Sequence, residues 1–235
     1  MENEKKQIYP QCGRTNYNAG IYADIAMRNY IRAKRQFECL DFGTTGLSEY
    51  LAFDLFFEYS VSTIIFSTMC IESFLNDYAA ACLGDDEFYG YFDKLSIEGK
   101  FALIGKFLLK TDIDKSVSYY SRLKKLVRDR NEYTHSKSLE VRLSDLAGLV
   151  SELTLEDLEA MRTEVKPYRE LLDSAKNSLC AIRDIAYFFD ANDSGIIATK
   201  RLFGIDIVVV DDARNDVRKE VWKELQIKLK DGAGG

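Results

Sequence analysis

Apolar residues recur every three or four positions over most of the 235-residue chain, which is the spacing of one face of an α-helix. The pattern predicts a first helix over about residues 17–40. It predicts a second, almost continuously apolar helix over about 48–83, ended by Gly84. Further helices are predicted over about 96–109 and 114–134. We therefore expect an all-α fold with the second helix at its centre.

A long apolar seam, with steps that alternate between three and four, begins after Thr154 and continues to about Phe189. Pro167 should kink this helix or mark a restart, because proline lacks the backbone donor that a helix interior needs. The seam suits packing within the chain's own fold or a coiled coil between two chains. Four to five long helices with short connections predict an up-and-down helical bundle.

The two ends of the chain depart from this pattern. Residues 1–16 are polar and contain Pro10, so we expect a mobile N-terminal arm ahead of a helical domain over residues 17–194. Residues 195–235 form a C-terminal appendage in this division. Within it, residues 205–210 (IDIVVV) predict a short buried strand, and residues 213–230 predict an amphipathic helix.

Composition narrows the class of protein. Hydrophobic residues make up 46% and charged residues 30% of the chain, which allows a sizeable core and excludes a disordered chain. Five scattered cysteines without C-x-x-C spacing indicate reduced thiols. No signal peptide is evident, and Glu72 and Asp77 interrupt the longest apolar runs, so we expect a cytoplasmic protein without a membrane span. With a net charge of −6, any nucleic-acid site must be locally basic.

His135 is the only histidine, and imidazole is the side chain that exchanges protons near neutral pH without help. The apolar stripe of the fourth predicted helix, Leu123, Leu126 and Val127, continues by helical steps to Arg130. A guanidinium at such a position is costly unless it is paired or faces water. We therefore expect Arg130 to mark a cleft or an interface.

Asn131 and His135 are four residues apart and share one helix face, within reach of the Arg130 side chain. Arg130 could hold a phosphate through two hydrogen bonds, His135 could move protons, and Asn131 could orient them. Such a set suits RNA cleavage, because the ribose 2′-OH is the nucleophile and the enzyme needs only a proton acceptor, a proton donor and a cation. This chemistry requires no metal and no other cofactor.

The motif Arg130-Asn131-x-x-x-His135 resembles the R-polar-x-x-x-H signature of the HEPN superfamily. Residues 68–77 (TMCIESFLND) resemble the A-x-E-x-F-I-N helix of the same family, and the resemblance covers about residues 17–190. It implies a metal-independent endoribonuclease whose site forms across a symmetric homodimer. Family members often serve as toxins or defence effectors restrained by a partner protein. Arg130, Asn131 and His135 are the site residues carried over, and Glu72 matches the second helix without an assigned role.

Basic residues surround the motif and could form a local RNA-binding patch, although such residues are also favoured near any helix C-terminus: Lys124, Lys125, Arg128 and Lys137. Two other functions stay open. The chain could be a catalytically silent HEPN-like module that binds a nucleotide or a protein, or a helical scaffold that dimerises through the long seam. In a helical scaffold, Arg130 and His135 would be ordinary helix-end residues on a solvated face.

Overall fold

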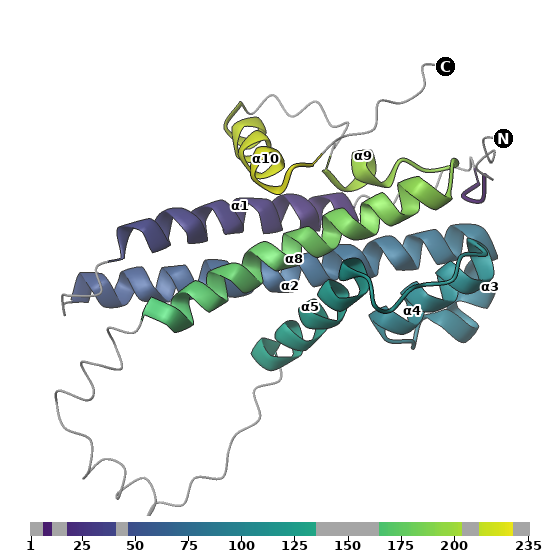
Figure 1. The fold of residues 1–235 in the computed structure, drawn as a ribbon, viewed down its shortest axis with the longest axis horizontal. Coiled ribbons are helices and arrows are strands. Elements are labelled where there is room, and N and C mark those ends of the chain that lie inside the picture. The colour runs from purple at the N-terminus through teal and green to yellow at the C-terminus, as the bar shows by residue number, and fades with distance from the viewer. Residues whose placement is uncertain (1–6, 11–17, 41–46, 135–164, 204–211, 228–235) are drawn as a thin grey trace, which may run out of the picture.

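A computed structural model describes residues 7–10, 18–40, 47–134, 165–203 and 212–227, and all regular elements in this part of the chain are helices (Figure 1). The all-α prediction is confirmed for these residues. The elements are α1 (Asn18–Cys39), α2 (Leu47–Leu83), α3 (Asp85–Glu87), the π-helical turn η1 (Phe88–Phe92), α4 (Ile97–Leu103), the π-helical turn η2 (Ile104–Leu108), α5 (Ser118–Thr134), α8 (Val165–Asn192), α9 (Ala198–Phe203) and α10 (Asp212–Leu225).

Helices α1 and α2 lie side by side and run in opposite directions, with α8 packed along both (Figure 1). Ring contacts join Phe37 to Phe56 and Tyr22 to Phe66, so the start of one helix meets the far part of the other. Phe74 of α2 packs edge-on against Phe189 of α8. Among the described residues, six of the twelve largest fully buried side chains come from α2, more than from any other helix, in agreement with its predicted place in the core.

Helix α2 ends as the sequence predicts. Gly84 follows its last residue with a φ of +95°, a conformation that favours glycine, and the Gly84 N–H donates to the Ala80 carbonyl at 3.0 Å. By length and composition alone, the stretch Leu51–Leu83 could cross a membrane, and 44% of its most apolar window is buried within the structure. One side of this apolar helix therefore stays outside the core.

The third predicted helix divides into α4 and η2. Ser96 caps α4 by accepting a hydrogen bond from the Gly99 N–H at 3.1 Å. The backbone then widens into η2, where a Cβ at Gly105 would lie 2.7 Å from side-chain atoms of Ile113. Glycine thus permits the segment after η2 to fold back against it.

Two residues of the expected N-terminal arm, Ile8 and Tyr9, hydrogen-bond to the core, and the mobility of the arm over residues 1–16 stays a prediction. The Ile8 and Tyr9 N–H groups each donate to the Asp193 carboxylate at 2.8 Å, and the Tyr78 hydroxyl donates to it at 2.6 Å. Asp193 is fully buried. The backbone of Tyr9 runs so close to Gly195 that a Cβ there would lie 2.4 Å from the Tyr9 carbonyl oxygen.

The C-terminal segment shares the core of the rest of the chain. Leu202 of α9 and Val221 and Leu225 of α10 are buried in it, and α9 was not predicted. The observed α10 is shorter than the predicted helix over 213–230. The predicted strand over 205–210 and the predicted helix start at Thr154 lie outside the described residues.

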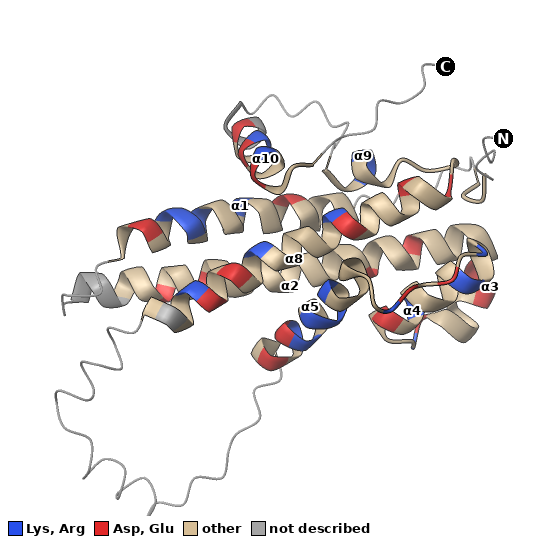
Figure 2. Cartoon of the chain, in the orientation of Figure 1, with Lys and Arg blue, Asp and Glu red and all other residues tan. Residues whose placement is uncertain are grey.

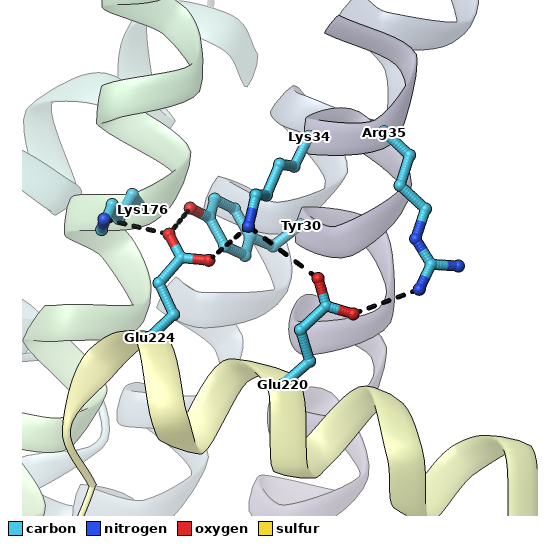
Figure 3. A network of polar contacts seen from close by, with 6 residues as sticks. All are labelled: Tyr30, Lys34, Arg35, Lys176, Glu220 and Glu224. Atoms are coloured by element: carbon cyan, nitrogen blue, oxygen red, sulfur yellow. Dashed lines mark hydrogen bonds and ion pairs between the residues drawn. The ribbon is translucent and has the colours of Figure 1, made fainter. Parts of the chain in front are cut away.

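Charged side chains fasten α10 to α1 and α8 (Figure 3). The Glu224 carboxylate accepts hydrogen bonds from the Tyr30 hydroxyl and from Lys34 at 3.0 Å, and it pairs with Lys176 at 2.9 Å. Burial by itself would raise the pKa of Glu224, but these three donors outweigh it and hold the pKa at about 2. Glu224 therefore stays ionised at neutral pH and connects three helices.

Candidate active site

The predicted motif lies at the C-terminal end of α5, which packs against α8 and α2 (Figure 1). Leu123, Leu126 and Asp129 are its buried residues. In the last turn, the Tyr133 ring meets Phe57 of α2 edge-on, with 6.0 Å between the ring centroids. Burial raises the pKa of the Tyr133 hydroxyl. The end of α5 is thus held against α2 by an aromatic contact, although Phe57 itself is largely exposed.

Arg130 lies one turn before Tyr133 and is half-buried. Its side chain makes no ion pair or hydrogen bond with any residue that the structure describes. Asn131 beside it is exposed and is likewise without a side-chain partner in the described ranges. His135 follows the last described residue of α5, so its position relative to Asn131 stays a prediction. At the helix end, the structure therefore places a guanidinium and an amide side by side, neither with a side-chain partner among the described residues.

The basic residues near the motif differ in their surroundings. The Lys125 ammonium pairs with Asp129 and donates to Ser174 Oγ at 2.6 Å. Arg128 also pairs with Asp129, with 3.5 Å between Nε and Oδ1. Basic and acidic side chains therefore lie close together along α5 (Figure 2). Asp129 was absent from the predicted site, although its place four residues after Lys125 is a spacing that favours ion pairs.

Lys124 is exposed and has no side-chain partner among the residues described. Lys137 lies outside the described residues. Of the predicted RNA-binding residues that the structure describes, Lys124 is thus the one that pairs with no described carboxylate. Asp129 thus offsets charge on Lys125 and Arg128, and an RNA-binding patch around the motif stays a prediction.

Glu72 has a structural partner that the sequence did not reveal. Its Oε1 accepts from the Lys100 ammonium of α4 at 3.3 Å, and the Lys100 side chain is almost fully buried. A buried ammonium is costly without a counter-charge, so Glu72 stabilises the contact between α2 and α4. Nothing in this arrangement brings Glu72 to Arg130.

Among the described residues, histidine, cysteine and carboxylate side chains form no group of three that could hold a metal ion. No family model, no curated protein and no solved structure matches the chain. The residues at the end of α5 are therefore the feature of the chain that points to a function.

Proposed function

We propose that this protein is a metal-independent endoribonuclease of HEPN type, an up-and-down helical bundle that works as a cytoplasmic homodimer. Regulation by an inhibitory protein partner, in a toxin or defence role, is part of the same proposal. The observation that carries it is Arg130, half-buried yet without an ionic partner among the described residues, beside the exposed Asn131. A guanidinium in that state is suited to bind a phosphate, because its planar donors match two phosphate oxygens.

The proposed reaction is transfer within the RNA strand. The ribose 2′-OH loses its proton to a base and attacks the adjacent phosphorus, while the 5′-oxygen leaves with a proton from an acid. The products are a 2′,3′-cyclic phosphate and a free 5′-OH. His135 is the single imidazole of the chain, so a homodimer would supply one imidazole as base and a second as acid. Arg130 would stabilise the charge on the phosphorane.

The test is cleavage of a mixed RNA pool by the purified protein, with analysis of the product ends. His135→Ala should lose activity by about 10²–10⁴-fold, since general acid–base catalysis contributes roughly that much. Arg130→Ala should be comparably inactive, and Arg130→Lys should restore little because an ammonium cannot bind two oxygens in the same plane. Asn131→Ala should be milder. EDTA should leave wild-type cleavage unchanged.

Equal cleavage by wild type and His135→Ala would assign the activity to a contaminant or another site. Strict dependence on Mg²⁺ or Mn²⁺ would contradict the mechanism. Circular dichroism should show that each variant keeps the helical content of the wild type.

A catalytically silent HEPN-like module that binds a nucleotide or a protein is the second candidate. The pairing of Asp129 with Lys125 and Arg128 favours it, because a less basic surface binds the RNA backbone less strongly. A wild-type protein that cuts no RNA under any condition, yet binds a nucleotide or partner through Arg130, would support this second function.

A further inference from the structure

An exposed aromatic ring lies beside the end of α5. In the described ranges, four large aromatic side chains are exposed: Phe57, Tyr89, Tyr91 and Phe107. Of these four, Phe57 is the one that makes a ring contact with α5, through Tyr133. The other three lie in η1 and η2. Phe57 of α2 is therefore the open ring nearest to the motif.

The contact with Tyr133 holds the Phe57 ring but does not cover it. The two rings meet edge-on, with 80° between their planes and 6.0 Å between their centroids. An edge-on pair leaves at least one face of the Phe57 ring free of Tyr133, and Phe57 is 51% exposed. A ring that is fixed on one side and open on the other loses little freedom when a flat group stacks on it.

Arg130 lies on the side of α5 that carries Tyr133. The two residues are three positions apart, so they share a helix face, with about 5–6 Å between their Cβ atoms. The half-buried Arg130 has no side-chain partner in the part of the chain that the structure describes. The end of α5 thus brings a guanidinium without an ionic partner and an open aromatic ring to within about one helical turn of each other.

We infer that Arg130 and Phe57 form a binding site for one nucleotide of single-stranded RNA, with the phosphate on Arg130 and the unpaired base stacked on Phe57. The inference rests on the proposed function for the identity of the ligand, and it adds a contact to the base that the motif lacks. One ribose links base and phosphate, so the groups that bind them must lie close together. A base within a duplex has both faces covered by its neighbours, so this site selects unpaired RNA.

The charges around Phe57 favour this orientation of the nucleotide. Asp54 and Glu58 lie three positions before and one position after Phe57, and both are exposed. Their carboxylates repel a phosphate placed at the ring, whereas a base carries no net charge and can stack there. Arg130 attracts the phosphate instead. Base and phosphate are therefore directed to different side chains.

The test compares two single strands with the same number of phosphates, an RNA that carries bases and an oligomer of abasic units. Binding is measured by fluorescence anisotropy in a His135→Ala background, in which the RNA should stay intact. Phe57→Ala should weaken binding of the RNA by about 5–150-fold, the usual loss for one base stacked on an aromatic ring. It should leave the weaker binding of the abasic strand unchanged. Arg130→Ala should weaken binding of both strands, because both carry phosphates.

Further variants separate stacking from helix packing. Phe57→Leu keeps an apolar contact with Tyr133 but has no aromatic face, so it should bind RNA as weakly as Phe57→Ala. Phe57→Trp should restore wild-type affinity or exceed it, because its aromatic face is larger. Phe107→Ala is the matched control, since Phe107 is a phenylalanine of similar exposure, 59%, that lies in η2. It should leave the affinity for RNA unchanged.

Two results would overturn the base site while RNA is still bound. An unchanged affinity in Phe57→Ala would remove the stacked base. Equal weakening for the RNA and the abasic strand would assign Phe57 a role in holding α5 in place. Self-association of the wild type that is lost in Phe57→Ala, with RNA affinity unchanged, would assign the ring to a protein contact.

The base site and the ribonuclease fail separately. RNA cleavage that requires Arg130 and His135 but not Phe57 would keep the ribonuclease and remove the base site. RNA binding that requires Arg130 and Phe57, without cleavage by the wild type, would keep the base site and remove the ribonuclease. A wild type that neither binds nor cuts RNA would remove both.

Discussion

Glu224→Gln offers a direct measurement of what fastens α10. The change keeps the size of the side chain but removes the charge that Tyr30, Lys34 and Lys176 surround (Figure 3). The pKa of Glu224 falls from 4.5 to about 2 in the folded protein, and each unit corresponds to about 1.36 kcal/mol. The upper limit is therefore about 3.4 kcal/mol. Solvent screening at the partly exposed lysines reduces it to about 1–3 kcal/mol.

The effect should depend on pH in one direction. A carboxylate whose folded pKa is depressed stabilises the fold above its unfolded pKa, here 4.5, and loses that contribution as the pH falls towards about 2. Wild type and Glu224→Gln should therefore differ fully above about pH 5.5 and converge near pH 2. The wild type should also lose α10 docking earlier than the rest of its helices as acid is added.

The chain carries a convenient probe, because its single tryptophan, Trp222, lies in α10. Urea unfolding followed by Trp222 fluorescence should shift to lower urea in Glu224→Gln, and amide exchange in α10 should accelerate by roughly 5–150-fold. Far-UV circular dichroism reports the remaining helices. Glu220→Gln is the matched control, since Glu220 pairs with Lys34 and Arg35 at a more exposed site and should cost less than about 0.5 kcal/mol. A difference between wild type and Glu224→Gln that does not vary with pH would refute the assigned cause.

Three further predictions concern other parts of the chain. Asp193→Ala should destabilise the protein by about 3–5 kcal/mol in urea titration, because it removes the acceptors of several buried donors. Residues 7–10 should then become accessible to limited proteolysis, whereas Asp216→Ala, at an exposed site, should change little. Lys124→Ala should weaken RNA binding and flatten its salt dependence, whereas Lys125→Ala should mainly lower the melting temperature, because its ammonium is already engaged by a neighbouring carboxylate. Gly105→Ala should lower the melting temperature by several degrees, since the added methyl group overlaps the side chain packed on it.

Local signals in the sequence were sufficient for much of the helical layout. The periodic apolar residues predicted α1, α2 and α5 to within a few positions, and Gly84 marked the end of α2 because its backbone conformation is a local property. Pro167 falls in the first turn of α8, where a missing backbone donor is tolerated. Arg130 stood out because a charge continued an apolar stripe, and the structure places it half-buried.

The tertiary structure alone decided which partners those residues meet. Asp193 and Tyr9 are 184 residues apart, and Lys100 and Glu72 are 28 residues apart, so neither contact can be predicted from local spacing in the sequence. The sequence of α2 is apolar nearly all round, which indicates a core helix but cannot say which side the other helices cover. Leu51, Leu55 and Met69 of α2 are exposed, and this follows only from where α1, α5 and α8 pack around the helix. Periodicity follows from the helix's own geometry, whereas pairing and exposure depend on elements that are distant in the chain.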